Sequence, residues 1–388
     1  MDSPVAAVLP RQLLENESRA RSKNLRSEKT FNLLAELLLS ESAEPAGDDQ
    51  RISAALQSVS SRSPEQMHDL LLQAESQRVL RRILAALKSH FSEQPRGALA
   101  EVLNQKLASE HQRVENALGR LQEIIWRFEK QGLPILVMKT LDHWPDTGSD
   151  LDLLVAAEEA DVRRIFRVDF QATQQPPSWG DRLAHKLNFR LPQLKELVEV
   201  HIGCLGQTGE HRPLAAAVLA RRIRRRYGAF SIPVPTHEDQ VAIATLQRMY
   251  RHYYIRLTEI VNIHGLLSAD RVDFDWLRAI SEEASIWPGV ATLIAVICQY
   301  SAAFGANPVT LPGHVHSAAR FHANRIYLDR KFLRVPLIPE ASGLFLRQIT
   351  DTFRRSSFGP VARLSLLPVL ATAAYLSFRI TGSDKGIW

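Results

Sequence analysis

Residues 134–155, PILVMKTLDHWPDTGSDLDLLV, decide the fold of this chain. The apolar, β-branched run at residues 134–138 predicts a buried strand that ends in a polar loop. Residues 150–155 predict a second strand, and the loop between the two strands is long enough to hold a ligand. Because successive side chains of a strand point to opposite faces, Asp150 and Asp152 share one face, while the leucines and the valine between and after them point into a core.

Two carboxylates on one strand face repel each other unless a cation lies between them. Asp150 and Asp152 offer oxygen ligands, which Mg²⁺ and Mn²⁺ prefer in sites that also hold substrate phosphates. A third carboxylate occurs in the alternating segment Leu197–Ile202, where Glu199 and His201 share a face. If this segment is a neighbouring strand, the three acids form a metal site. The alternative is that they are ordinary solvated acids at the ends of strands.

These segments resemble the polymerase-beta-type nucleotidyltransferases, and more narrowly the bacterial family of uncharacterised nucleotidyltransferases. The family pattern reads Leu-Lys-Gly, then Asp-Ile-Asp-Leu-Leu-Val, then Glu-(Ile/Leu)-His-Trp. Residues 150–155, DLDLLV, match it closely, and so does Glu199-Val-His201, although Ile202 stands where the family has tryptophan. The order of expected elements also follows the family over most of the chain.

The resemblance implies an α+β fold: a small mixed-sheet nucleotidyltransferase core with N-terminal helices and a larger C-terminal helical domain. It implies metal-dependent transfer of a nucleoside monophosphate from a nucleoside triphosphate such as ATP to a hydroxyl or phosphate of an unidentified small-molecule or macromolecular acceptor. In this interpretation Asp150, Asp152 and Glu199 are catalytic and bind Mg²⁺ or Mn²⁺. Glu199 is instead a general base if it is not bound to the metal.

Four further residues are candidates for binding the nucleotide. Lys139 ends the first strand, where its cation meets a phosphate, and Thr140 and Ser149 offer hydroxyl donors. His201 shares the face of Glu199 and is placed to orient substrate or water. The sequence is equally compatible with a solvated lysine and with a structural histidine.

Two positions depart from the family pattern and support a second hypothesis. Thr140 follows Lys139 where the family has glycine, and no arginine occurs within residues 146–150, ahead of the aspartates. In the family both positions help to hold phosphates. The second hypothesis is therefore a catalytically silent binding or scaffold protein with the same fold.

A third hypothesis is a toxin-like enzyme that modifies transfer RNA, which the basic run at residues 221–226, RRIRRR, would suit. RNA binding is not indicated by this run, because Tyr227 is the only aromatic residue beside it. A solvated helix face is the simpler interpretation. Residues 251–254 and Glu259 lie where the family has a histidine-rich helix followed by an acid, on the acceptor side of the cleft; helix periodicity alone would make the tyrosines core.

Composition excludes few functions. The 388 residues, 45% hydrophobic and 23% charged, are typical of a globular protein, and a net charge of +6 with a pI near 9.4 favours anionic partners. Cys204 and Cys298 have no metal-site spacing, and the start of the chain lacks the pattern of a signal peptide, so we expect a cytoplasmic protein. Phosphate-loop, dinucleotide-binding, zinc-protease and serine-hydrolase motifs are absent from the sequence.

The sequence predicts four regions: a flexible arm and linker with a short helix at 1–50, an N-terminal helical region at 51–114, the α/β core at 115–205 and a helical domain at 206–388. The short helix is expected at residues 31–40. Ser63, Pro64 and Gln66 predict the capped start of a helix that runs toward Leu87.

Within the core and the helical domain, further patterns predict individual elements. Apolar residues spaced three and four apart predict a helix over residues 114–128. A second helix is expected over residues 158–170. Alternating residues 186–191 predict a strand that pairs with the one carrying Glu199. Thr236 and Asp273 are expected helix N-caps. The uncharged segment 364–378 is too short to span a bilayer; a helix packed in the core is favoured over one facing a membrane.

Overall fold

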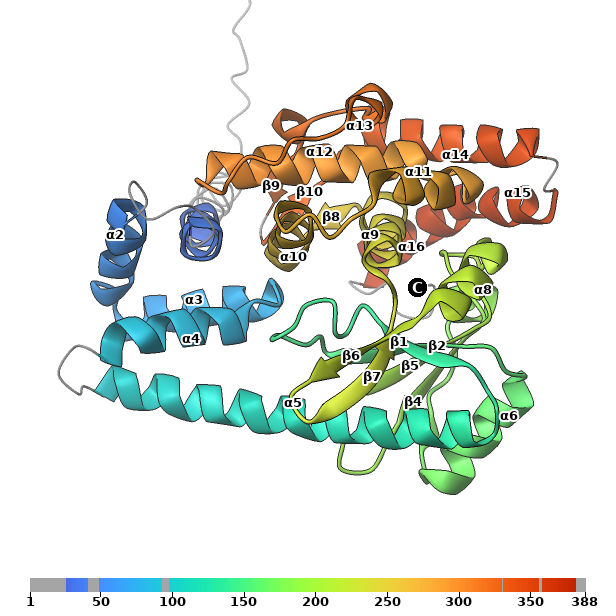
Figure 1. The fold of residues 1–388 in the computed structure, drawn as a ribbon, viewed down its shortest axis with the longest axis horizontal. Helices are drawn as coiled ribbons and strands as arrows, with labels where there is room; N and C mark the ends of the chain where they lie inside the picture. The colour runs from blue at the N-terminus through green and yellow to red at the C-terminus, as the bar shows by residue number, and fades with distance from the viewer. Residues whose placement is uncertain (1–25, 41–48, 93–97, 330, 356–357, 382–388) are drawn as a thin grey trace, which may run out of the picture.

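The computed structural model describes residues 26–40, 49–92, 98–329, 331–355 and 358–381. The arm and most of the linker predicted within residues 1–50 lie outside them. The short helix expected from Phe31 is part of a helix over residues 26–39. The fold is α+β, as predicted: a small mixed sheet, N-terminal helices and a larger set of C-terminal helices (Figure 1).

Five strands form the central sheet. They are β1 (Ile135–Met138), β2 (Asp150–Val155), β3 (Thr173–Gln174), β4 (Lys186–Arg190) and β5 (Leu197–Ile202), in the order β1-β2-β5-β4-β3. Strands β2 and β5 are parallel, and the other neighbours are antiparallel. In this register Asp152 lies opposite Glu199, so two of the predicted carboxylates occupy adjacent positions on neighbouring strands.

Each face of the sheet packs on a different hydrophobic core. Val137 and Leu153 face the core that includes α5 (Ala98–Lys130), whereas Leu136 and Leu154 join the core of the other helices. The predicted periodic residues of α5 are all at most 2% exposed: Val114, Leu118, Leu121, Ile125 and Phe128. Figure 1 shows α5 on one side of the sheet and the helices α9 to α12 on the other. Because strand positions alternate, Asp152 and Glu199 share the side of Leu154, which faces those helices.

The N-terminal helices are α2 (Asp49–Ser60), α3 (Pro64–Ser76) and α4 (Leu80–Ser92). The predicted capping box is present, since the Ser63 hydroxyl accepts a hydrogen bond from the Gln66 N–H and the Gln66 side chain accepts one from the Ser63 N–H. The single helix expected from Ser63 toward Leu87 is wrong. The chain breaks where Arg78 adopts a left-handed φ of +56°, a conformation that ends a helix.

Short helices and π-helical turns connect the strands. The helix expected over residues 158–170 is α6 (Glu159–Arg164), continued by a π-helical turn at Ile165–Asp169, and α7 (Trp179–Leu183) precedes β4. The predicted pairing of β4 with the strand that carries Glu199 is confirmed.

Helices dominate after residue 205, as predicted. They are α8 (Arg212–Arg221), α9 (His237–Gln247), α10 (Leu257–Ser268), α11 (Phe274–Glu283), α12 (Trp287–Ala303), α13 (Gly313–Ala318), α14 (Ser342–Arg354), α15 (Phe358–Leu364) and α16 (Leu367–Thr381). The side chains of Thr236 and Asp273 cap α9 and α11, as the sequence predicts. Leu84 and Leu293 belong to one hydrophobic core, so the N-terminal and C-terminal helices pack around a shared interior.

The basic run at residues 221–226 is not a helix face, because only Arg221 is helical, as the last residue of α8. Ile223–Tyr227 form β6, which pairs with β7 (Phe230–Val234) in a hairpin that turns at Gly228, where φ is +57°. The physical reason is tertiary: Tyr227 and its neighbours on β7 pack into the core that includes α5, and this burial outweighs the helix propensity of arginine. Three short strands form a further sheet: β8 (Tyr254–Ile255), β9 (Tyr327–Asp329) and β10 (Phe332–Arg334).

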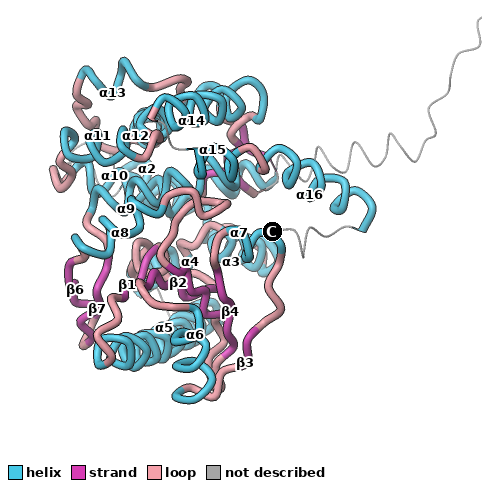
Figure 2. The backbone as a smooth tube through the Cα atoms, turned by 90° about the vertical axis from the view of Figure 1, so that its right-hand side faces the viewer, coloured by secondary structure: helices cyan, strands magenta, loops and turns pink. Residues whose placement is uncertain are grey.

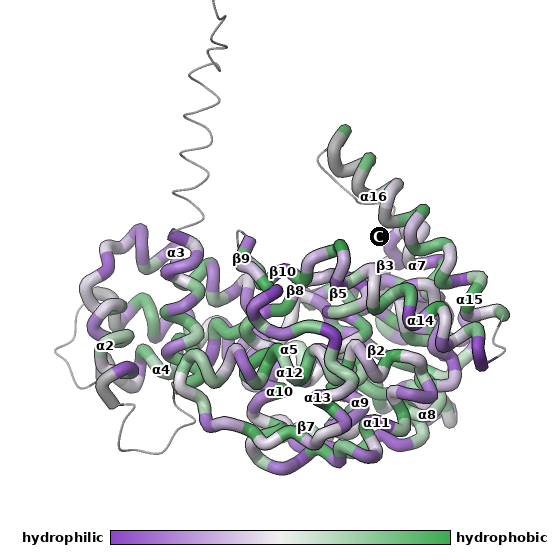
Figure 3. The backbone as a smooth tube through the Cα atoms, turned by 90° about the horizontal axis from the view of Figure 1, so that it is seen from above, coloured by the Kyte–Doolittle hydropathy of each residue, from purple (hydrophilic) through white to green (hydrophobic). Residues whose placement is uncertain are grey.

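The uncharged C-terminal segment is helical except for a turn at residues 365–366, and the expected burial holds only at its start, where Leu364 and Leu367 are buried. Val369 is 66% exposed and Leu376 53% exposed, and α16 extends away from the body of the molecule (Figures 2 and 3). In the described part of the chain no neighbouring element covers this face, so apolar composition alone did not ensure burial. Within the same residues, no helix combines the length and hydropathy needed to cross a bilayer.

Candidate active site

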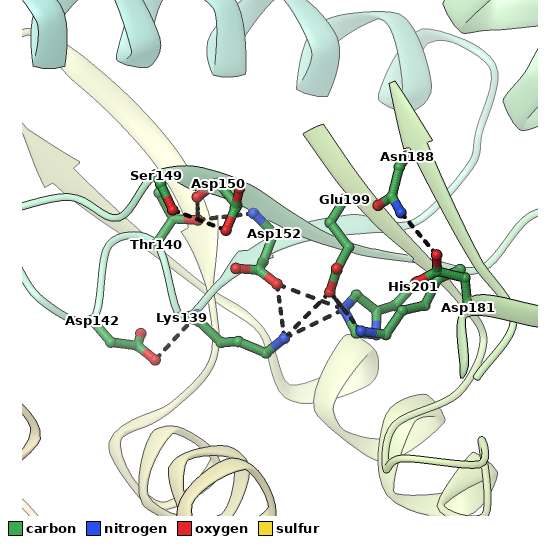
Figure 4. Close-up of polar contacts among 11 residues, drawn as sticks. Lys139, Thr140, Asp142, Ser149, Asp150, Asp152, Asp181, Asn188, Glu199 and His201 are labelled. Carbon is green, nitrogen blue, oxygen red and sulfur yellow. Dashed lines mark hydrogen bonds and ion pairs between the residues drawn. The ribbon is translucent and has the colours of Figure 1, made fainter. Parts of the chain in front are cut away.

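The strand register brings together Lys139, Asp152, Glu199 and His201. Asp152 and Glu199 occupy opposite positions on β2 and β5, and His201 follows Glu199 by one strand repeat. Lys139 directly follows β1, and the last residue of β1, Met138, lies opposite Asp152. Figure 4 shows the four side chains converging from these three strands.

The Lys139 ammonium lies among the three other side chains. Its Nζ is 2.7 Å from Asp152 Oδ1, 3.3 Å from His201 Nε2 and 3.8 Å from Glu199 Oε1. The residue has a left-handed φ of +60°, which costs free energy for a side chain other than glycine and is common at functional sites. The backbone thus holds a cation between the two carboxylates.

Glu199 contacts two more side chains. Its Oε1 is 2.7 Å from Lys186 Nζ and 2.7 Å from His201 Nε2. Lys186 is a residue that our sequence analysis did not select as a site residue. The alternation of β4 in the sequence put Lys186 on one face with Asn188, but only the register of β4 with β5 places it opposite His201. Burial, with the neighbouring Arg251, lowers the pKa of Lys186 to about 8.

The electrostatics keep both carboxylates ionised. Burial acts to raise the pKa of Asp152, but Lys139 and His201 hold that pKa below its usual value. Burial also acts to raise the pKa of Glu199, and Lys186 and His201 hold it well below its usual value. Burial, together with the two lysines, lowers the pKa of His201, so its ring is neutral near pH 7.

Asp152, Glu199 and His201 are grouped closely enough to hold a metal ion. One ligand atom from each lies within 4.8 Å of the others. Carboxylate oxygens suit Mg²⁺ or Mn²⁺, and the Nε2 atom of His201 faces both carboxylates, 3.6 Å from Asp152 Oδ1 and 2.7 Å from Glu199 Oε1. Lys139 shows that this group of acids already attracts a cation, so the donors present fit a divalent ion that displaces the ammonium.

The other predicted site residues lie beside this group. The Ser149 hydroxyl is 3.1 Å from Asp150 Oδ2, and Asp150 lies outside the three-residue metal group. Burial, then the charge of Asp152, raises the pKa of Asp150. The metal-binding role of Asp150 and the phosphate role of Ser149 stay predictions.

Thr140 connects the loop to the start of β2. Its hydroxyl donates to the Asp150 carbonyl at 3.1 Å and accepts from the Asp152 N–H at 2.8 Å. The side chain is buried, with 1% exposure. Its hydroxyl therefore positions the backbone of the two aspartates, and the expected hydrogen bond to a phosphate would require this arrangement to change.

Replacing Thr140 with valine should lower the free energy of unfolding by about 1–3 kcal/mol, because valine keeps the shape but leaves the buried Asp152 N–H without an acceptor. Thr140→Ser keeps the hydroxyl, so its loss should stay near about 1 kcal/mol, the cost of one buried methyl group. Urea unfolding of both variants measures the difference. Equal stability of the two variants would show that the hydroxyl is dispensable.

An arginine that is distant in the sequence lies against the loop before the aspartates. No arginine occurs within residues 146–150, but the guanidinium of Arg78 lies so close to Gly148 that a Cβ atom there would be 3.0 Å from its Cζ. Arg248 is fully buried and donates to Glu259 at 2.6 Å. The expected acidic residue, Glu259, thus belongs to a buried ion pair.

Comparisons with known proteins give one family. The family model described as "Uncharacterised nucleotidyltransferase" matches residues 63–298, which is more than half of the chain. Among curated proteins, none matches this chain. A similar solved structure is the crystal structure of an antigenic nucleotidyltransferase-like protein from Paracoccidioides brasiliensis, with 11% sequence identity, a TM-score of 0.34, and coverage of 50% of this chain and 94% of that chain.

Proposed function

The chain belongs to the family of uncharacterised nucleotidyltransferases, and from this premise we propose that it transfers a nucleoside monophosphate from a nucleoside triphosphate to an acceptor, with Mg²⁺ or Mn²⁺. The observation that carries the proposal is the pairing of Asp152 with Glu199 on parallel neighbouring strands, with His201 beside them. The two carboxylates are ion-paired with Lys139 and Lys186, and the proposal requires that a divalent ion take the place of the Lys139 ammonium.

Each residue has a role in this proposal. Asp152, Glu199 and His201 hold the metal ion. Asp150 lies two residues earlier on the same face of β2. When bound, the ion polarises the phosphoryl group and makes an acceptor hydroxyl easier to deprotonate. Lys139, released from Asp152, neutralises a phosphate oxygen, and Lys186 keeps Glu199 ionised and oriented.

The melting temperature of the protein should rise by about 2 °C or more when Mg²⁺ or Mn²⁺ is added together with a nucleoside triphosphate at about 100 times its Kd, because binding to the folded state alone adds about 2.7 kcal/mol. Neither the metal nor the nucleotide alone should give the full shift. A panel of ATP, GTP, CTP and UTP with EDTA controls, read by scanning fluorimetry, measures it. An unchanged melting temperature with every metal and nucleotide pair would contradict the proposal.

A silent binding or scaffold protein remains the second candidate, favoured by one observation. The Thr140 hydroxyl is occupied by the backbone of β2, so it offers no donor to a phosphate in this arrangement. A labelled triphosphate separates the two candidates. An enzyme releases pyrophosphate in the presence of metal and cell extract as the source of acceptor, whereas a binding protein shows the thermal shift without turnover.

The basic run lends the transfer-RNA hypothesis little support. Arg221 is paired with the buried Asp239, with Nη2 2.5 Å from Oδ1, and Arg224 is paired with Glu129. Two arginines of the run are thus already neutralised by the protein. The acceptor therefore stays open between small molecules and macromolecules.

A further inference from the structure

A pocket of about 510 Å³ lies beside the start of β2. Its walls come from the turn between α3 and α4, from α5, from residues 146–149 and from the segment before β5. Arg256, just ahead of α10, completes it. The pocket thus adjoins Asp150, the residue that follows Ser149 in its wall.

Most acids of this pocket are paired with Arg113 or Arg82, so these two arginines are not available to bind an anion. Arg113 contacts Glu110 at 3.0 Å and Glu196 at 2.5 Å. Asp146 pairs with Arg82 at 3.5 Å and accepts a hydrogen bond from the Arg81 N–H at 2.6 Å. The remaining acid, Glu75, is exposed.

Arg78 lines this pocket without a countercharge in contact. Within the described residues its guanidinium has neither a hydrogen bond nor an ion pair, and its charge acts on Asp150. The side chain is half-buried and lies against Gly148, a close approach that the missing Cβ of glycine allows. Both the turn conformation of Arg78 and the glycine therefore place a free guanidinium next to the aspartates.

Arg256 is the second cation of the pocket. Its Nη2 donates to the Tyr254 hydroxyl at 3.1 Å, and its Nε is buried without a partner. Burial, followed by the charges of Arg248 and Arg78, lowers the pKa of Arg256 to about 10. The carboxylate of Glu259, which accepts from Arg248 and from the Arg256 N–H, offsets part of this effect, and an anion in the pocket would offset more of it.

We propose that Arg78 and Arg256 bind a phosphate group in this pocket, beside the metal-binding acids. A guanidinium presents planar, paired donors that match phosphate oxygens, which a lysine cannot do. The proposal rests on the proposed function, because it assigns the phosphate either to the terminal phosphates of the nucleoside triphosphate or to a phosphorylated acceptor. Both sources offer the same phosphate chemistry to the two arginines.

Calorimetric titration with inorganic triphosphate in EDTA tests the site without any metal. The wild type should bind, and Arg78→Gln and Arg256→Gln should each weaken binding by about 10- to 100-fold, the loss expected for one charge-assisted pair of hydrogen bonds. Lys195→Gln is the matched control: it removes an exposed charge from the same pocket and should change the Kd by less than about threefold. No binding by the wild type, or equal binding by the arginine variants, would overturn the proposal.

A second variant protects the test against loss of folding. Gly148→Ala keeps every charge but places a Cβ atom 3.0 Å from the Arg78 guanidinium, which must then shift. It should weaken triphosphate binding less than Arg78→Gln, while the circular-dichroism melting curve stays cooperative. Unaltered binding in Gly148→Ala together with unaltered binding in Arg78→Gln would remove Arg78 from the site.

Two further measurements distinguish the sources of the phosphate. If the arginines hold the nucleotide, Arg78→Gln weakens binding of the metal–nucleotide complex and leaves nucleoside binding unchanged. If they hold the acceptor, orthophosphate binds the wild type even with saturating metal–nucleotide, and Arg78→Gln abolishes only that binding. Asp152→Asn should keep triphosphate binding in EDTA, so failure of the metal site and failure of the arginine site are seen separately.

Discussion

Replacing Asp152 with asparagine should lower nucleotidyl transfer by about 1,000-fold or more, because a bound metal ion contributes several kcal/mol of transition-state stabilisation and each 1.36 kcal/mol is a factor of ten. Asparagine keeps the size of the side chain but removes the charge that Lys139 and His201 face. The same variant should lose the melting-temperature shift given by metal and nucleotide. Pyrophosphate release and scanning fluorimetry measure the two effects.

The matched control is Asp169→Asn. This exposed aspartate follows α6 and is not part of the group formed by Asp152, Glu199 and His201, so its replacement should leave transfer and the thermal shift within about twofold of the wild type. Asp152→Asn is expected to fold, because Lys139 still faces Glu199 at 3.8 Å. A melting curve of the variant without ligand checks this. Transfer within tenfold of the wild type would exclude Asp152 as a metal ligand.

Replacing Glu259 with glutamine should destabilise the protein by about 3–5 kcal/mol, because breaking a buried ion pair leaves an uncompensated charge. Glu259 is 3% exposed and accepts from Arg248 Nη2 at 2.6 Å and from the Arg256 N–H at 2.8 Å. Arg248 is fully buried, and two more of its nitrogen atoms, Nε and Nη1, have no partner. Urea unfolding followed by circular dichroism measures the loss of free energy.

The control for this pair is Arg278→Ala, which breaks an exposed pair with Glu282 at 2.7 Å and should cost about 0.5 kcal/mol or less. The double variant Arg248→Met with Glu259→Leu removes both buried charges and should recover much of the lost stability. A loss below about 1 kcal/mol in Glu259→Gln would mean that the cations nearby are stabilised by other means.

The pH dependence of the same variant has a defined sign. Burial acts to raise the pKa of Glu259, but Arg248, His143 and Arg256 hold it below its usual value. A carboxyl with a lowered pKa in the folded state stabilises the protein above its unfolded pKa of about 4.3, and this stabilisation is lost as the pH falls through the folded value. The stability of the wild type should therefore fall more steeply than that of Glu259→Gln below about pH 4.3.

Local patterns in the sequence were sufficient for several elements of this fold. The capping residues Ser63, Thr236 and Asp273 each begin a helix where expected, because a cap depends on contacts within three residues. The alternation of β2 and β5 is also local, so it predicted which acids share a face. That the two strands are neighbours was a condition of the prediction, and the pairing of β2 with β5 meets it.

Other expectations failed where long-range packing outweighed local preference. The arginine-rich run at 221–226 was interpreted as a helix face but contains β6, since charges carry no strand or helix period and the burial of Tyr227 decides. The apolar segment at 364–378 was expected in the core, yet α16 leaves Val369 exposed. Apolar composition indicates that a helix face favours burial, but burial also requires a neighbouring element that packs on that face.

The sequence by itself determined the fold class, the strand pair with its acids, and the family. Only the tertiary structure decided which further cations lie near those acids: Lys186 contacts Glu199 from β4, and the charge of Arg78, in a turn more than 70 residues before Asp152, acts on Asp150. The physical reason is that strand alternation and helix caps depend on residues close together in the chain, which leave a recognisable local pattern. A contact between distant segments depends on how helices and sheet pack, and packing leaves no period in the sequence.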